Sequence, residues 1–180
     1  MSFAYKLLPQ YTYEDYCRWE GKWELINGIP YAMSPAPRPE HQRIAGSLHA
    51  ELRAAIKKSG CDCSIYQPLD YKIADDTVLN PDLMIVCKPI EKTFLDFAPE
   101  LVVEILSPAT ALKDRHTKFE IYEQQKINFY LIIDVDKQDV EIYNLDMDGS
   151  YQQLPVVMKD PFQFQLPNCR FSLTFENIWD

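Results

Sequence analysis

The chain has 180 residues, of which 47% are hydrophobic and 25% are charged, and its formal net charge is −9. This length and composition exclude a disordered protein, and we expect residues 1–180 to form one domain. No apolar stretch is long enough to cross a membrane. The negative net charge argues against a protein whose function depends on non-specific affinity for nucleic acids, because that affinity comes from Lys and Arg. It is compatible with an acidic metal site.

The N-terminus and the cysteines indicate the cellular compartment in which the protein is found. Met1 to Lys6 lack the apolar region and the cleavage site of a signal peptide, so we expect a cytoplasmic protein. The five cysteines are odd in number and scattered, which argues against a disulfide framework and agrees with a reducing compartment. Cys61 and Cys63 resemble half of a metal site, but no second Cys or His pair lies at zinc-finger spacing. We therefore expect them to be small strand residues.

Three helices are predicted. Thr12 and Asp15 form a capping-box pattern that predicts a short helix over residues 13–19. A longer helix is predicted over residues 40–58, where one apolar stripe is formed by Ile44, Leu48, Leu52 and Ile56. A third helix should follow Ser107 and run to about Gln125. We expect its inner face to carry Leu112, Phe119 and Tyr122.

Strands are predicted for most of the remaining chain. Asn27-Gly28 joins two β-rich runs within residues 23–33, which predicts a hairpin on which Glu24 is a solvated residue. Two fully apolar runs, at 83–86 and 101–106, are typical of strands buried on both faces. Further strands are expected at 61–67, 69–73, 129–135, 140–145, 151–157 and within 162–179.

This order of elements predicts an α/β protein of mixed α+β type, with a central mixed β-sheet flanked by helices. The strand–helix–strand unit from Leu101 to Val135 should form a parallel crossover.

One carboxylate is out of place in this pattern. Glu104 lies in the middle of an apolar strand, where an ionised side chain is costly unless a cation, a metal or strong donors meet it. Asp82 begins the neighbouring apolar run, so the two carboxylates can converge. Two close carboxylates repel each other, and a hard divalent cation such as Mg²⁺ relieves that repulsion. A bound metal also lowers the pKa of its water and neutralises charge on a phosphodiester.

A lysine on the following helix would complete such a site. Lys118 is the candidate, because that helix should pack back over the strand that carries Glu104. Each residue also has a purely structural explanation. Asp82 can cap a turn, Glu104 can form a buried salt bridge with Lys118, and Lys118 can pair with Asp114. Surface or boundary positions are expected for the three histidines, His41, His49 and His116.

The combination resembles the PD-(D/E)xK nuclease superfamily, which has the restriction-endonuclease-like fold, and within it the Uma-type branch. The resemblance covers about Trp23 to Tyr143. Its markers are residues 23–28, His41, residues 80–82, residues 102–108, Asp114, Lys118 and Tyr122. In most of the superfamily the lysine stands two residues after the glutamate, a position that Leu106 occupies here. The resemblance therefore implies a lysine that has moved to the helix, which is Lys118 in this chain.

The resemblance implies an endonuclease that hydrolyses DNA with Mg²⁺ or Mn²⁺. Asp82 and Glu104 would be metal ligands, the Ile105 carbonyl would add a further ligand, and Lys118 would support the water and the phosphate. It also implies a homodimer, and it makes Glu24 an auxiliary acid near the metal. Two alternatives stay open: a catalytically inactive module of the same fold that binds protein or nucleic acid, and metal-dependent hydrolysis of another phosphate ester.

Overall fold

A computed structural model describes residues 8–33, 36–108 and 110–179. The residues that bear on a signal peptide, Met1 to Lys6, lie outside this described part. Within it, none of the helices combines the length and the apolar character needed to cross a membrane.

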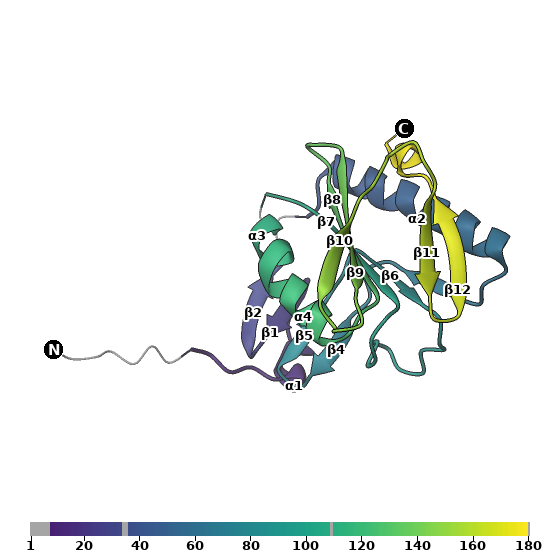
Figure 1. The fold of residues 1–180 in the computed structure, drawn as a ribbon. Helices are drawn as coiled ribbons and strands as arrows, with labels where there is room; N and C mark the ends of the chain where they lie inside the picture. The colour runs from purple at the N-terminus through teal and green to yellow at the C-terminus, as the bar shows by residue number, and fades with distance from the viewer. Residues whose placement is uncertain (1–7, 34–35, 109, 180) are drawn as a thin grey trace.

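The centre of the fold is a six-stranded sheet with the order β10-β9-β8-β7-β6-β3 (Figure 1). In that order the strands span Tyr151–Leu154, Asp139–Leu145, Phe129–Asp134, Leu101–Ile105, Leu83–Val86 and Ser64–Tyr66. Strands β7 and β8 run parallel and every other neighbouring pair is antiparallel, so the predicted mixed sheet and parallel unit are confirmed. All residues of β7 are buried, as its apolar sequence indicated.

Two smaller sheets flank the centre. A four-stranded antiparallel sheet has the order β2-β1-β5-β4, with strands Ile29–Ala32, Trp23–Ile26, Thr77–Leu79 and Tyr71–Ala74. Its hairpin turns at Asn27 and Gly28, which both have positive φ, as the sequence predicted. The third sheet is the hairpin of β11 (Phe162–Leu166) and β12 (Cys169–Leu173). Strand β5 was not predicted from the sequence, because it is only three residues long.

The helices cover both faces of the central sheet. Helix α1 (Tyr13–Tyr16) begins with the predicted capping box but ends earlier than expected. Helix α2 (Pro39–Ser59) buries the predicted apolar stripe and ends at Gly60, whose φ is 72°. The third predicted helix is divided into α3 (Ala111–Lys113), a π-helical turn η1 (Asp114–Lys118) and α4 (Phe119–Gln124). A 3₁₀ turn, η2 (Phe175–Ile178), follows the last hairpin.

Side chains alternate between two cores across the central sheet. Val103 and Ile105 of β7 pack with α2 and the β11–β12 hairpin. Val102 points to the opposite face, toward α4 and the four-stranded sheet. Because side chains alternate along a strand, Glu104 shares the face of Val102 and meets the segment η1–α4 there.

The cysteines contradict the sequence-based expectation of unpaired thiols. Cys61 and Cys169 form a disulfide, and so do Cys63 and Cys87. The first bond joins residues 108 positions apart, which the β11–β12 hairpin brings to the end of α2. The second lies beside the antiparallel β3–β6 pair. Neither contact leaves a signal in the local sequence, and Cys17 is a free, exposed thiol.

Candidate metal-dependent site

The predicted pair of carboxylates lies at one end of β6 and β7. Leu83 pairs with Val103, so Asp82, just before β6, comes beside Glu104. The Asp82 Oδ2 atom accepts a hydrogen bond of 2.8 Å from the Ile105 N–H. Glu104 is 3% exposed. The sheet register therefore places two acids from distant parts of the sequence at one edge.

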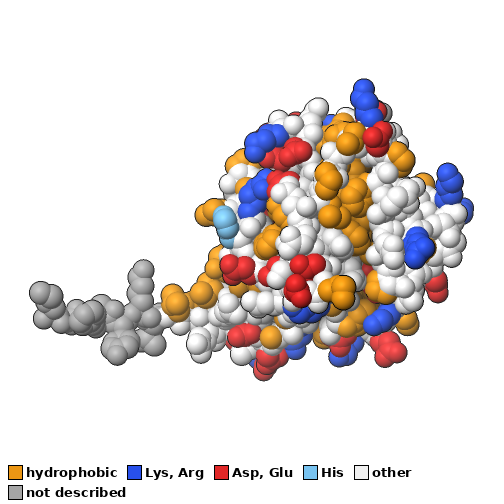
Figure 2. Space-filling model, in the orientation of Figure 1, with side chains coloured by type: hydrophobic (Ala, Val, Ile, Leu, Met, Phe, Trp, Pro, Cys, Tyr) orange, Lys and Arg blue, Asp and Glu red, His pale blue; other side chains and the backbone are white. Residues whose placement is uncertain are grey.

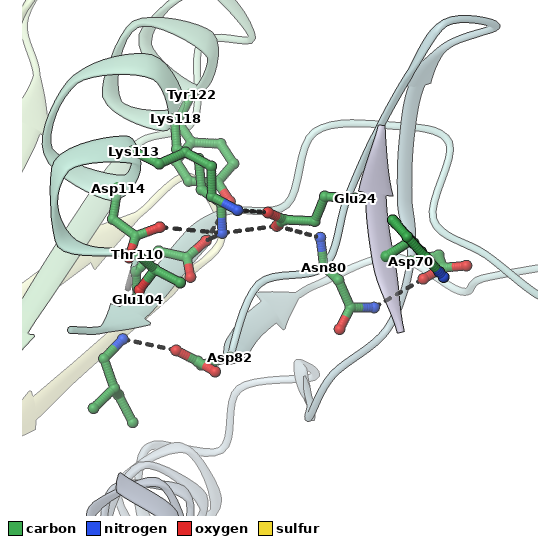
Figure 3. A network of polar contacts seen from close by, with 12 residues as sticks. Glu24, Asp70, Asn80, Asp82, Glu104, Thr110, Lys113, Asp114, Lys118 and Tyr122 are labelled. Atoms are coloured by element: carbon green, nitrogen blue, oxygen red, sulfur yellow. Dashed lines mark hydrogen bonds and ion pairs between the residues drawn. The ribbon is translucent and has the colours of Figure 1, made fainter. Parts of the chain in front are cut away.

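Lys118 is enclosed by carboxylates. Its Nζ atom lies 2.8 Å from Glu104 Oε1, 2.8 Å from Glu24 Oε1 and 3.3 Å from Asp114 Oδ1 (Figure 3). Burial by itself would lower the pKa of Lys118, but the three carboxylates raise it well above its ordinary value. Lys118 is thus a fixed positive charge inside the protein, and the predicted proximity to Glu104 is present.

The π-helical turn explains how the helix reaches the site. Asp114, Lys118 and Tyr122 are all buried on the side that faces β7. The Tyr122 hydroxyl donates a 2.6 Å hydrogen bond to Glu104 Oε1. A π turn is wider than an α turn and changes which side chains point inward. The prediction that Leu112 lies on the inner face is therefore wrong: its side chain lies in the short α3 segment before the turn and is 76% exposed.

Glu24 is not the solvated hairpin residue that the sequence suggested. It is fully buried on β1. Its Oε2 atom pairs with Lys113. Its Oε1 atom contacts Lys118 and also accepts a 3.1 Å hydrogen bond from the Asn80 N–H. Burial opposes ionisation, but Lys118 and Lys113 outweigh it and lower the pKa of Glu24. Sequence reasoning missed Lys113, because its partner lies 89 residues away.

His41 lies at the boundary of the site, which is one of the two positions expected for it. The first turn of α2 directs its Nε2 atom to within 3.2 Å of Asp82 Oδ2, and its side chain is 12% exposed. Burial disfavours the charged imidazole, but hydrogen bonds with Asp82 and the Ile105 backbone outweigh it and raise the pKa of His41. His41 thus orients one of the two predicted metal-binding carboxylates.

The site carries more negative than positive charge. Among the described residues, the four carboxylates of Glu24, Asp82, Glu104 and Asp114 stand against the ammonium groups of Lys113 and Lys118 and the imidazole of His41. Burial, together with the charges of Asp114 and Asp82, raises the pKa of Glu104 well above its ordinary value even though Lys118 opposes the shift. A divalent cation would relieve the same excess of negative charge.

A cavity of about 910 Å³ opens onto these groups. Its lining includes His41, Asp82, Glu104, Lys113 and Lys118. Nowhere in the described ranges do three or more His, Cys, Asp or Glu side chains form a metal-holding group. Magnesium needs fewer ligands, because it uses one or two protein carboxylates and keeps several waters. The donors present, two carboxylates and the Ile105 carbonyl at the end of β7, are hard oxygen ligands that fit Mg²⁺ or Mn²⁺ rather than zinc.

A second hollow of about 600 Å³ lies between the end of α2 and the turn of the β11–β12 hairpin. Arg170 is the one charged side chain among its described lining residues. It lacks the acidic groups that a metal would need, so we place the candidate chemistry in the first cavity.

Comparisons with known proteins identify a family and a structural neighbour. The family model Uma2, described as "Putative restriction endonuclease", matches residues 12–174. The chain is 28% identical over 175 residues to the "Uncharacterized protein slr1290" of Synechocystis sp. (strain ATCC 27184 / PCC 6803 / Kazusa), covering 92% of this chain and 90% of that protein. A crystal structure titled "a putative nuclease belonging to DUF820", from Anabaena variabilis ATCC 29413, superposes with a TM-score of 0.72 at 16% identity, covering 93% of this chain and 97% of the other.

Proposed function

The chain belongs to the Uma2 family of putative restriction endonucleases, and from this premise we propose that it is a Mg²⁺-dependent endonuclease that hydrolyses phosphodiester bonds of DNA. The observation that carries the proposal is the pair Asp82 and Glu104 at one edge of the sheet, beside the buried ammonium of Lys118. A structural salt bridge would need only one acid for one lysine. The surplus of carboxylates instead suits a divalent cation.

The contacts of the two acids indicate which oxygens would hold the metal. Lys118 and Tyr122 both contact Oε1 of Glu104, and the Ile105 N–H and His41 both contact Oδ2 of Asp82. Oε2 of Glu104 and Oδ1 of Asp82 are outside these contacts, so Glu104 and Asp82 would hold the metal, with the Ile105 carbonyl as a third protein ligand. A bound Mg²⁺ would supply an acidified water and charge neutralisation at the phosphate.

Lys118 takes the part that a strand lysine plays elsewhere in the superfamily. The Leu106 N–H completes the sheet by bonding the Ile133 carbonyl, at 2.8 Å, and the Leu106 side chain packs against the core around Tyr122. Lys118 reaches the same end of β7 from the helix. Its fixed charge would stabilise the phosphate as negative charge builds on it. Glu24 holds Lys118 and Lys113 in place, with both of its oxygens already engaged.

Cleavage of labelled DNA with and without Mg²⁺ tests the proposal. Glu104→Gln keeps an oxygen that can accept from Lys118 and Tyr122, and Asp82→Asn keeps one that can accept from the Ile105 N–H. Each variant should cut at least about a hundredfold more slowly, because it removes charge needed for the metal and the transition state. Asp160→Asn, at an exposed position, should cut normally. Cleavage that persists in EDTA, or that is unchanged in Glu104→Gln, would show the assignment to be wrong.

One feature favours a second candidate, an inactive nuclease-fold module. Three carboxylates already surround Lys118, so the cluster is partly neutralised without a metal. Calorimetry separates the two functions: heat of binding for millimolar Mg²⁺ or Mn²⁺ that disappears in Asp82→Asn supports the nuclease, and its absence in the unmodified protein supports the module.

A further inference from the structure

The mouth of the cavity differs chemically from its floor. The floor consists of the buried charged groups Glu24, Glu104, Asp114 and Lys118. The mouth carries apolar or aromatic side chains that the proposed hydrolysis does not use, namely Tyr31, Ala32, Met33, Pro37, Pro108 and Leu112. Tyr31 is 37% exposed and Leu112 is 76% exposed. A volume of about 910 Å³ is in the range of pockets that enclose an organic ligand, and it exceeds what a single phosphate group requires.

The β1–β2 hairpin fixes the position of Tyr31 relative to the site. Tyr31 is paired directly with Glu24, so the two side chains project from the same face of the hairpin. The Lys113 Nζ atom lies 5.4 Å from the centre of the Tyr31 ring and is also paired with Glu24. This cation–π contact steadies the ring at the rim of the acidic floor. An aromatic platform therefore stands next to the position proposed for the reacting phosphate.

The charges around the cavity are poorly suited to a DNA duplex. Duplex binding relies on Lys and Arg side chains that contact backbone phosphates. In the described lining, Arg38 is paired with Asp136, Lys113 with Glu24, and Lys118 with three carboxylates. Figure 2 shows Lys and Arg side chains scattered among acidic ones on the face in view, without a continuous basic surface. Two of the lining cations, Lys113 and Lys118, are thus held by buried carboxylates, and contacts other than phosphate clamps would add to the affinity for DNA.

We propose that the mouth of the cavity is a subsite for an unpaired nucleobase, that Tyr31 is its stacking platform, and that the substrate is single-stranded DNA. Base–aromatic stacking supplies affinity where the bases are free, whereas a duplex must first pay to unpair and expose a base. The identity of the ligand rests on the proposed nuclease function. The apolar rim beside Tyr31, including Leu112, would exclude water from the bound base.

Binding without catalysis tests the subsite first. Fluorescence anisotropy in EDTA would compare three labelled oligonucleotides of one length: a single strand, the matching perfect duplex, and a single strand with abasic positions. The single strand should bind most tightly. Tyr31→Ala should weaken its binding by about tenfold or more, as expected for the loss of one base–aromatic stack. Tyr31→Phe should retain the affinity, because the ring is kept.

A matched control is Tyr11→Ala, which removes another exposed tyrosine that does not line the cavity. It should bind like the unmodified protein. Tyr31 lies on β2, at the edge of its sheet, so Tyr31→Ala should fold, and a thermal melt checks this. Equal binding of duplex and single strand, equal binding of the abasic strand, or no effect of Tyr31→Ala would overturn the subsite.

Cleavage with Mg²⁺ then separates the two proposals. Faster cutting of the single strand than of the duplex supports both. Equal cutting of duplex and single strand leaves the nuclease and overturns the subsite. Tyr31-dependent binding of the single strand with no cutting of either DNA leaves the subsite and overturns the nuclease. Failure to bind or cut either DNA overturns both.

Discussion

Lys118 is a buried charge held by three carboxylates. It is 2% exposed and contacts Glu24, Glu104 and Asp114. Removing one partner from a buried ion pair leaves an uncompensated charge and typically costs about 3–5 kcal/mol. We therefore expect Lys118→Met to lower the free energy of unfolding by about 3 kcal/mol or more, as measured by urea denaturation at pH 7.

Lys137→Met is the matched control. Lys137 pairs with Asp134 at the surface, where its side chain is 72% exposed, and such pairs contribute about 0–1 kcal/mol. If Lys118→Met were as stable as Lys137→Met, the Lys118 cluster would not hold the fold together as described.

A second cluster should make stability depend on pH. The Glu141 carboxylate contacts Arg115 at 2.6 Å and also accepts a hydrogen bond from Tyr143. Burial opposes ionisation, but these partners outweigh it and lower the pKa of Glu141. A lowered pKa in the folded state means that the stabilisation is present above the unfolded pKa, about 4.3, and is lost as the pH falls through the folded value.

Glu141→Gln should therefore have a lower free energy of unfolding than the unmodified protein at pH 7. When the pH falls below about 5, the free energy of unfolding should decrease less in the variant than in the unmodified protein. Urea midpoints measured at a series of pH values would show this as an acid limb, the part of the midpoint–pH curve below about pH 5, that is less steep than that of the unmodified protein. Glu14→Gln, which removes a carboxylate from an exposed surface pair, is the control. An identical acid limb for Glu141→Gln would contradict the assignment.

The sequence indicated part of the candidate site at this scale. Glu104 was conspicuous as a charge in an apolar strand, and it pointed to Asp82 and Lys118 as partners. Glu24 was judged a solvated hairpin residue, whereas His41 was expected at the surface or the boundary, where it lies. The burial of Glu24 involves a contact with Asn80 across 56 residues, and His41 meets Asp82 across 41 residues. Local pattern does not encode contacts of that kind.

At the scale of elements, helix α2 follows its sequence closely. Its apolar stripe, its proline start and its glycine end are local signals, and the structure confirms them. The segment 111–124 was harder to predict, because one π turn changes the spacing of inward side chains over only a few residues, too few for the periodicity of the sequence to reveal it. Asp114 and Lys118, four residues apart, are both buried within this π turn.

Two glycines of α2 should respond in opposite directions to the same substitution. Gly60 has a φ of 72°, and an added Cβ would meet no atom within 4 Å, so Gly60→Ala should destabilise by about 1 kcal/mol through backbone strain alone. Gly46 lies within the helix with the same open space, so Gly46→Ala should stabilise by about 0.5–1 kcal/mol. Urea denaturation measures both. If both substitutions stabilised the protein, or both destabilised it, the description of the helix end would be contradicted.

At the scale of the whole molecule, the disulfides are the main departure from the sequence-based account. The Cys61–Cys169 bond joins residues 108 positions apart. For a loop of that length, chain-entropy estimates give a stabilisation of about 4–5 kcal/mol, whereas the measured stabilisation by a disulfide is typically about 2–4 kcal/mol. Protein prepared without reductant should expose one reactive thiol on denaturation, that of Cys17. Cys169→Ser should reduce the free energy of unfolding by about 2–4 kcal/mol.

Thiol titration of denatured protein, with Cys17→Ser as control, checks the pairing. The control should show no reactive thiol. Five reactive thiols in the unmodified protein would mean that the bonds do not form under those conditions, as a reducing compartment would impose.

The fold as a whole was largely accessible from the sequence, because buried apolar runs, one amphipathic helix and one Asn-Gly turn define the central sheet and its coverings. The sequence did not reveal how the four-stranded sheet and η1 close over Glu104. That closure turns separate charged residues into a single cluster with surplus negative charge.

The central claim is that Asp82 and Glu104 together hold a divalent cation, and anomalous diffraction from a crystal soaked in millimolar Mn²⁺ tests it most directly. The account predicts an anomalous peak between the two carboxylates, next to the Ile105 carbonyl, that is lost in Asp82→Asn crystals. An anomalous map without a peak at that position, with Lys118 still in contact with Glu104, would contradict it.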